Sequence, residues 1–233
     1  MHENHFQEQV HQEIDQIFCS LFPKYGMTIR EEQLRLCHQM LSALWNGQIA
    51  LCDAAVGVGK TYAYLTASLL FRKYSGMLSG NYCMSRDRRP IVISTSSIAL
   101  QDALLEEYIP QLSELLVKGG VLKRPIRAVL RKGKEHFACE ERLNLRIVAV
   151  QKKRKNVSQK AALDGLRRTF DLDTAGSLSS FDRRMVCVPK RCPADCSLRE
   201  QCRYQNFVRQ AVETEYDIQI CNHNYFLADA IHR

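Results

Sequence analysis

One short run of residues constrains this chain more than any other: AAVGVGKT, from Ala54 to Thr61. Residues 48–53 (QIALCD) before it are apolar enough for a short buried strand, and an amphipathic helix is expected from about Lys60 to Phe71. A strand, a glycine-rich turn and a helix in that order form a phosphate-binding loop, because backbone N–H groups and the helix N-terminus attract an anion. The sequence therefore predicts a nucleotide site, although Ala54 stands where the general pattern has glycine.

Each residue type in this loop has a physical purpose. Gly57 and Gly59 would let the backbone wrap a polyphosphate, Lys60 would reach the β- and γ-phosphates, and the Thr61 hydroxyl would coordinate Mg²⁺. Hydrolysis also needs an apolar strand that ends in acidic residues, and the sequence has no such strand ending in Asp-Glu. We therefore expect that this chain either binds nucleotide without cleaving it or stops before that motif. The remaining members of the predicted site are Ala54, Ala55, Val56 and Val58.

Strands and helices alternate along most of the chain. Helices are expected over 31–45, 60–71 and 98–108, and strands over 48–53, 90–95, 126–130 and 217–221. Thr28 and Glu31 have capping-box spacing, and Pro110 is expected to end the third helix. This alternation predicts an α/β fold with a parallel sheet. The segment before the last strand breaks the rhythm and is interpreted as a mainly helical insertion.

Charge is concentrated in that insertion. The chain has a net charge of +8, and residues 134–210 hold 17 of its 33 basic side chains but 9 of its 25 acidic ones. This local excess predicts a phosphate-rich partner such as nucleic acid, and a solvated basic face is the alternative. No apolar run approaches the ~18 residues of a membrane helix, and no signal-peptide core is present, so a cytoplasmic protein is expected.

Cysteines gather in or beside the same basic segment. Clustered thiols in a cytosolic chain favour a metal site over disulfides, and neighbouring arginines would lower the thiol pKa values. Sulfur ligands suit either Zn²⁺ or an iron–sulfur cluster, and reduced buried thiols are the alternative reading. The cysteines are Cys139, Cys187, Cys192, Cys196 and Cys202, and the arginines are Arg191, Arg199 and Arg203.

The order of these motifs resembles a known family. Arg30 with Gln33, DAAVGVGKTYAYL, IVISTSSIALQDALLEEYIPQL, RKGKEHFACEERL, the later cysteines and ICNHNYFLAD occur in the order found in DinG/XPD-like iron–sulfur DNA helicases of superfamily two. Bacterial DinG-like members are the most similar. The resemblance implies a RecA-like motor domain over 1–133, an inserted iron–sulfur domain over 134–203 and a return to the motor domain over 204–233. It also implies ATP-driven 5′ to 3′ translocation on single-stranded or forked DNA, and a role in DNA repair.

The resemblance also implies roles for individual residues. Gln33 would read adenine with the help of Arg30, and Thr95 and Gln101 would lie in an element that contacts DNA. For Thr95 and Gln101 the alternatives are a strand-end cap and a solvent-facing helix residue. The motif around His223 receives no chemistry, because a single histidine at a strand end is usually a hydrogen-bonded structural group.

Four cysteines are needed for a 4Fe–4S cluster. Cys139 matches the family's first ligand, and Cys196 and Cys202 reproduce its final five-residue gap. Cys192 is favoured for the remaining place, since valines flank Cys187, but the spacing between these two cysteines also resembles a family pattern. Such a cluster would act as a rigid pin that positions basic residues against DNA phosphates. These residues are Lys152, Lys153, Arg154 and Lys155.

Some family elements do not occur in the sequence. An Asp-Glu-Ala-His box would follow shortly after Asp229, and a second motor domain with an arginine finger would come later. The expectation is therefore the N-terminal portion of a helicase, which binds nucleotide weakly and does not turn it over alone. The alternative is a non-enzymatic, zinc-stabilised module that binds nucleotide or nucleic acid.

Overall fold

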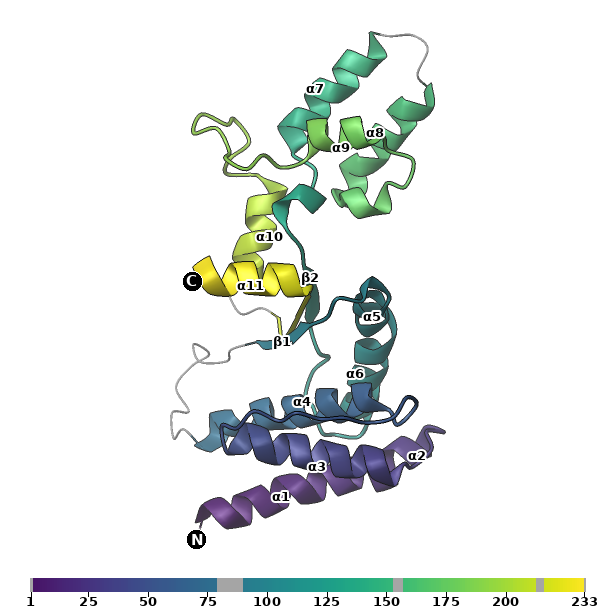
Figure 1. The fold of residues 1–233 in the computed structure, drawn as a ribbon, viewed down its shortest axis with the longest axis vertical. Helices are drawn as coiled ribbons and strands as arrows, with labels where there is room; N and C mark the ends of the chain where they lie inside the picture. Colours follow the sequence, from purple (N-terminus) through teal and green to yellow (C-terminus); the bar gives the residue numbers. More distant parts are fainter. Residues whose placement is uncertain (1, 79–89, 153–156, 213–215, 233) are drawn as a thin grey trace. The chain divides into compact units, whose positions relative to one another are not determined.

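The computed structural model describes residues 2–78, 90–152, 157–212 and 216–232 (Figure 1). The chain divides into two compact units. Unit 1 comprises Met1–Leu130 and Tyr216–His223, and unit 2 comprises Arg131–Glu215 and Asn224–Arg233. Within the described ranges, no helix combines the length and the apolar character needed to cross a membrane.

The sheet of unit 1 confirms the α/β class. Its strands are β1 (Ile91–Ser94), β2 (Ala128–Arg131) and β3 (Ile218–Cys221), in the order β1-β3-β2. β1 and β3 are parallel, with Ile91 opposite Ile218 and Ser94 opposite Cys221. Every residue of β3 is buried, as expected for a central strand that is covered on both faces. Three of the four predicted strands are therefore present within two residues of their predicted bounds.

The fourth predicted strand, over 48–53, does not form. The sheet in the described part of the chain contains only β1, β2 and β3, and the side chains of Ile49 and Leu51 are fully exposed. A strand is stable only when a neighbouring strand satisfies its backbone N–H and C=O groups. The apolar residues of 48–53 suit a strand, but the apolar pattern does not show whether another strand lies beside them to pair with.

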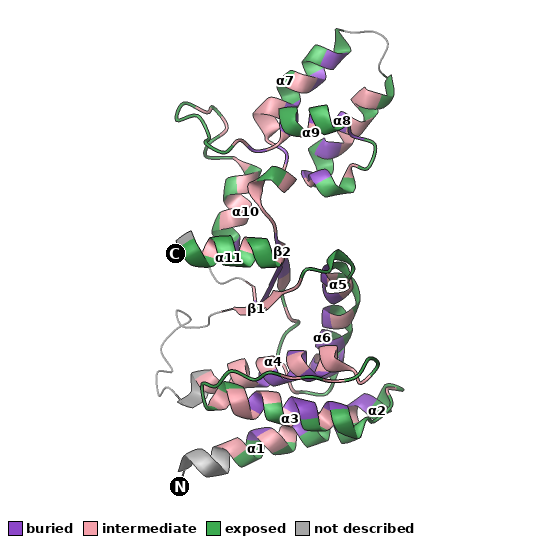
Figure 2. Cartoon of the chain, viewed as in Figure 1, coloured by how far each residue is buried: buried purple, intermediate pink, exposed green. Residues whose placement is uncertain are grey.

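Helices make up most of unit 1. The long helices α1, α3 and α4 pack together, and Figure 2 shows their buried residues in purple. Their shared core includes Ile14, Cys37, Leu41 and Leu65. The helical segments are α1 (His2–Gln16), η1 (Ile17–Leu21), α2 (Phe22–Lys24), α3 (Glu31–Trp45), α4 (Lys60–Leu78), α5 (Ile98–Ala103), η2 (Leu104–Tyr108) and α6 (Ile109–Lys118).

Two local predictions in unit 1 are wrong. α3 begins at Glu31 as expected, but its N-cap is Arg30 and no side chain caps it, so Thr28 does not form a capping box. Pro110 does not end a helix, because the chain passes through the π-helical turn η2 into α6. Pro110 lies in the first turn of α6, where a missing backbone N–H costs little.

The buried carboxylate of Asp217 connects the start of β3 to three arginines. Asp217 directly precedes β3 and is 8% exposed. Its oxygens accept from Arg72 at 2.8 Å and from both terminal nitrogens of Arg124 at 2.8 and 2.9 Å. The backbone N–H of Arg127 also donates to it at 2.9 Å. Burial acts to raise the pKa of the Asp217 carboxyl, but these donors and positive charges outweigh it and hold the pKa below its ordinary value.

Unit 2 is mainly helical. Its core is formed by residues such as Leu143, Ile147, Leu163, Leu166 and Val186. Asp182, which is 1% exposed, joins three segments by accepting from Arg146 at 2.6 Å and Gln159 at 2.6 Å. The segments are η3 (Lys134–His136), α7 (Glu140–Gln151), α8 (Val157–Thr169), η4 (Leu172–Thr174), α9 (Ser180–Val186), α10 (Arg203–Val212) and α11 (His223–His232), whose first residue belongs to unit 1.

Candidate functional site

The predicted phosphate loop immediately precedes α4, whose first residue is Lys60. Gly57 and Gly59 have φ angles of +89° and +88°. L-residues with a side chain rarely adopt these angles, so both positions require glycine. The loop therefore has the glycine-dependent backbone that the sequence pattern predicts.

Polar side chains of the loop contact its own backbone. The ammonium of Lys60 donates to the carbonyl oxygens of Ala54 at 2.5 Å and Ala55 at 3.0 Å. The Thr61 hydroxyl is near enough to Tyr64, one turn further along α4, to oppose the rise in the Tyr64 pKa that burial causes. Both groups assigned to phosphate and Mg²⁺ thus lie at the start of α4, and an incoming phosphate would compete with the carbonyls for Lys60.

The start of α3 lies against the same loop. Arg30 Nη1 donates to the carbonyl oxygen of Gly57, and Gln33 Nε2 donates to that of Gly59 at 2.6 Å. Gln33 is only 5% exposed. The structure therefore brings Arg30 and Gln33 together with residues 54–61, which lie more than twenty positions away in the sequence.

Gly59 provides a direct test of this contact. A Cβ atom at Gly59 would lie 2.1 Å from Gln33 Nε2, whereas one at Gly57 would meet nothing within 4 Å. We expect Gly57→Ala to lower the free energy of unfolding by about 1–2 kcal/mol through backbone strain. Gly59→Ala should cost about 1 kcal/mol more, because Gln33 must also give up its hydrogen bond.

Denaturation followed by Trp45 fluorescence measures both variants, since Trp45 is the single tryptophan and lies in α3. When Gly59→Ala is already present, adding Gln33→Ala should change the free energy of unfolding very little. The contact that Gln33→Ala would remove is then already lost, which is the outcome a double-mutant cycle detects. Equal destabilisation by the two glycine variants would show that Gln33 does not support the loop.

Two of the residues predicted to contact DNA follow β1, because Thr95 comes directly after the strand and Gln101 lies on α5. Gln101 is 6% exposed and its side-chain amide donates to the carbonyl of Thr95 at 2.9 Å. The alternative reading of Gln101 as a solvent-facing residue is therefore wrong. The Thr95 hydroxyl accepts from the N–H of Ser97 at 3.2 Å, and its own N–H donates to the carbonyl of Cys221. Gln101 thus fixes the Thr95 backbone.

His223 pairs with the neighbouring strand end. Its Nδ1 lies 2.7 Å from the hydroxyl of Ser94, the last residue of β1. This contact joins the ends of β1 and β3, which are paired at Ser94 and Cys221. The geometry is that of a hydrogen-bonded structural histidine.

In unit 2, Cys139 is the N-cap of α7 and is partly buried. Burial raises the pKa of its thiol, and the nearby thiols of Cys196 and Cys202 raise it further against the opposing effect of two backbone N–H groups. Cys196 Sγ lies 3.5 Å from a carboxylate oxygen of Glu141 in the first turn of α7. Cys196 therefore lies beside the first turn of α7, and Cys202 is near enough to influence the Cys139 thiol.

Cys187 and Cys192 lie in different surroundings. Cys187 follows α9, between the buried Val186 and Val188, and its thiol is 3.4 Å from the carbonyl of Arg184. Cys192 is exposed and lies close enough to Tyr204 to influence its pKa. All nine cysteines in the described ranges are free.

The thiols do not form a closed ligand set. Across the described residues, no three His, Cys, Asp or Glu side chains are arranged to hold a metal ion. Thiols are the ligand type that a sulfur-bound metal or an iron–sulfur cluster requires. These thiols, however, do not point at one common position where a metal could be held. Of the arginines near these thiols, Arg199 donates to the carbonyl of Ala194 and Arg203 donates to those of Arg167 and Arg168.

The basic residues predicted to contact DNA phosphates are only partly described. Lys152 directly follows α7 and is exposed. Lys153, Arg154 and Lys155 lie outside the described residues.

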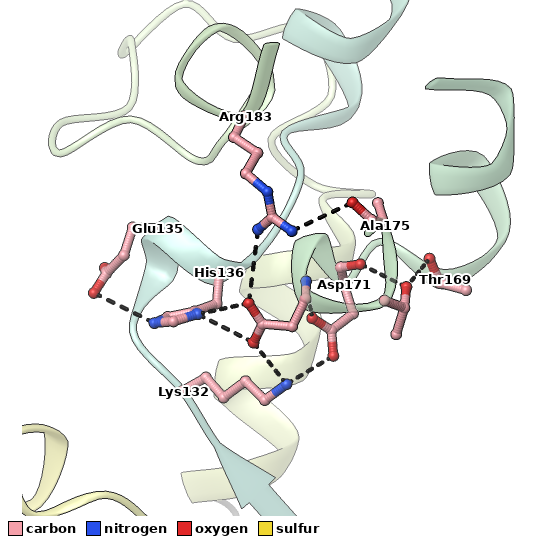
Figure 3. A network of polar contacts seen from close by, with 9 residues as sticks. Lys132, Glu135, His136, Thr169, Asp171, Ala175 and Arg183 are labelled. Carbon is pink, nitrogen blue, oxygen red and sulfur yellow. Dashed lines mark hydrogen bonds and ion pairs between the residues drawn. The ribbon is translucent and has the colours of Figure 1, made fainter. Parts of the chain in front are cut away.

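The sequence reasoning missed a polar network before Cys139. Lys132 Nζ lies 2.9 Å from Asp171 and 3.0 Å from Asp173, and His136 Nδ1 lies 3.0 Å from Asp173. Figure 3 shows Lys132 and His136 directed toward the turn that carries Asp171. The network fastens the segment leading to Cys139 onto η4. Lys132 and His136 belong to the motif RKGKEHF, and this motif was the feature of the sequence that could have indicated the network. Their acidic partners could not be identified from it, because they are about forty residues away in the sequence.

Comparison with known proteins supports the resemblance to DinG-like proteins. The chain is 26% identical over 214 residues to the ATP-dependent DNA helicase YoaA of Escherichia coli K12, a match that covers 88% of the chain and 30% of the relative. It is 30% identical over 114 residues to the 3′-5′ exonuclease DinG of Bacillus subtilis 168, covering 49% of the chain and 10% of the relative. The same exonuclease of Staphylococcus aureus USA300 is 30% identical over 121 residues, covering 52% and 12%.

The chain thus spans less than a third of the length of the curated relatives it matches. No protein-family model matches it. The relatives nevertheless confirm the resemblance that the ordered motifs indicate.

Proposed function

We propose, from the similarity to DinG-like helicases, that this chain is the ATP-binding part of a DNA helicase motor. The observation that carries the proposal is the phosphate loop, in which Lys60 and Thr61 open α4 while Gln33 of α3 contacts the backbone at Gly59. The similarity to an ATP-dependent DNA helicase extends over most of the chain. Unit 1 would then be a RecA-like motor domain that uses nucleotide to move along DNA.

In this proposal, the loop N–H groups bind the phosphates of ATP. Lys60 exchanges the carbonyls of Ala54 and Ala55 for the β- and γ-phosphates, and Thr61 holds Mg²⁺. Arg30 and Gln33 contact the loop backbone from the start of α3, and they would also read adenine. Hydrolysis and 5′ to 3′ movement belong to the complete motor, which includes acidic and arginine groups beyond those of this site.

The nucleic-acid partner would be single-stranded or forked DNA. Thr95 offers a hydroxyl just after β1, a group suited to contacts with phosphate and sugar that are independent of sequence. Gln101 would act through Thr95, because its buried amide on α5 fixes the Thr95 backbone. Lys152 and the three basic residues after it would add contacts whose strength falls as salt concentration rises. A role in DNA repair is part of the same proposal.

Unit 2 would carry a 4Fe–4S cluster. Cys139, Cys196 and Cys202 would supply three thiolates, which is supported by the influence of Cys196 and Cys202 on the Cys139 thiol, and Cys192 would supply the fourth, with Cys187 as the alternative. Zn²⁺ is the other metal that such a ligand set accepts. When bound, the cluster supplies a rigid cross-link between segments that are about fifty residues apart.

Binding of ATP in the presence of Mg²⁺ tests the proposed function. Lys60→Ala should weaken binding about 10- to 100-fold, because a charge-assisted hydrogen bond to phosphate contributes roughly 1.5–3 kcal/mol. Titration of a fluorescent ATP analogue measures the affinity. Lys118→Ala is the matched control, since Lys118 is exposed and pairs only with Glu114 on the same helix among the ion pairs of the described residues. Equal affinity of the Lys60 variant and the unmodified chain would contradict an ATP site here.

A further inference from the structure

Two histidines of unit 1 face each other between helices. His11 lies on α1 and His38 on α3, and their Nδ1 atoms are 2.7 Å apart. The ring planes are inclined by 21° with centroids 5.0 Å apart, so the rings meet edge to edge through their Nδ1 atoms. The predicted nucleotide and DNA functions use neither residue.

The outer nitrogen of each ring also has a partner. His38 Nε2 lies 2.9 Å from a carboxylate oxygen of Asp15, and His11 Nε2 lies 3.4 Å from the Ser42 hydroxyl. Because an ionised carboxylate only accepts hydrogen bonds, His38 carries its proton on Nε2 and presents a lone pair at Nδ1. Neutral His11 can place its proton on Nδ1, toward His38, or on Nε2, toward Ser42.

With the His11 proton on Nε2, two lone pairs point at one another. That arrangement is repulsive unless a cation lies between the two Nδ1 atoms. Histidines that bind a metal through one nitrogen almost always donate the other N–H to a carboxylate, carbonyl or water. Asp15 provides such an acceptor for His38, and Ser42 provides a hydroxyl for His11.

We propose that His11 and His38 bind a divalent transition-metal ion of the Zn²⁺ type through their Nδ1 atoms. Imidazole nitrogen is a preferred ligand for such ions, at about 2.0–2.1 Å. Two nitrogens in a tetrahedral site lie about 3.4 Å apart, so the rings need to separate by only about 0.7 Å. No third protein ligand of the usual types joins them in the described part of the chain, so water completes the coordination.

Binding requires no net loss of a proton. The His11 proton moves from Nδ1 to Nε2, where the Ser42 hydroxyl accepts it, and the vacated lone pair binds the ion. The bound ion connects α1 to α3, and because only the folded chain presents both nitrogens together, zinc should raise the melting temperature of unit 1.

Zinc titration of the full chain tests the proposal. The readouts are the number of zinc ions bound per chain by calorimetry and the imidazole ¹⁵N chemical shifts by NMR. Zinc that the cysteines take up is common to all variants, so the comparison is between variants. His11→Gln and His38→Gln should each bind one zinc ion fewer than the unmodified chain, and should abolish the zinc-induced shift of the partner's Nδ1.

Two further variants complete the test. His223→Gln changes a histidine of unit 1 that contacts Ser94 and, among the described residues, no other histidine, and it should keep the full zinc stoichiometry. Asp15→Asn leaves both ligands in place but should weaken binding about 10- to 100-fold, the usual effect of removing a carboxylate that orients a metal-bound histidine. The Asp15 side chain is 55% exposed, so this variant should fold normally. Unchanged stoichiometry in His11→Gln, with imidazole shifts that zinc does not move, would overturn the proposal.

Discussion

Asparagine in place of Asp217 should lower the free energy of unfolding of unit 1 by about 3 kcal/mol. The substitution removes the carboxylate charge that Arg72 and Arg124 share, and breaking a buried ion pair from one side is strongly destabilising. It also weakens the acceptor that receives the Arg127 N–H. Urea denaturation followed by Trp45 fluorescence measures the loss.

The effect of Asp217 should depend on pH. Since the folded chain holds the pKa of Asp217 below its ordinary value, its contribution is fully present above about pH 4. That contribution is lost as the pH falls through the lower pKa of the folded state. The difference between the unmodified chain and Asp217→Asn should therefore shrink in acid.

Asp102→Asn serves as the control for Asp217. Its carboxylate is exposed on α5, and surface changes of this kind usually stay within about 0.5 kcal/mol. If Asp217→Asn were as stable as this control at neutral pH, the ion pairs with Arg72 and Arg124 would contribute nothing to the fold.

Serine in place of Cys139 should remove the proposed cluster from the chain. A cluster bound through four thiolates loses one ligand, and unit 2 loses the cross-link between α7 and the segment around Cys196 and Cys202. After anaerobic purification, iron and sulfide content should fall to background and the thermal unfolding of unit 2 should shift to lower temperature. Visible absorbance and circular dichroism measure the two effects.

Other cysteines give the controls for this experiment. Cys19→Ser changes an exposed cysteine of unit 1 and should leave iron and sulfide unchanged. Comparing Cys192→Ser with Cys187→Ser identifies the fourth ligand, because only its loss should release the cluster. A colourless protein that binds zinc stoichiometrically through Cys139 would instead favour the zinc-stabilised binding module.

Features that depend on neighbouring residues could be predicted from the sequence. The positive φ angles of Gly57 and Gly59 and the helix start at Lys60 follow from a continuous motif. β1 and β3 also lie where apolar runs predicted them. In each case the side chains that decide the local structure lie within a few positions of one another.

Features that depend on distant partners were missed. The pattern of residues 48–53 suits a strand, but pairing requires another segment, and none of the described strands supplies it. Pro110 looked like a helix end because the π-helical turn before it leaves no sequence pattern. His11 and His38 are 27 positions apart and on different helices, so only the packing of α1 against α3 could reveal their contact.

The backbone contact between Arg127 and Asp217 determines how much variation the segment between them can tolerate. The N–H of Asp217 donates to the carbonyl of Arg127 at 2.7 Å, so the chain leaves and re-enters unit 1 at almost the same point. The entropy of closing such a loop grows only slowly with its length. The intervening ninety or so residues, which include the thiols and most of the excess positive charge, can therefore be lengthened, shortened or exchanged during evolution while the strands at either end keep their register.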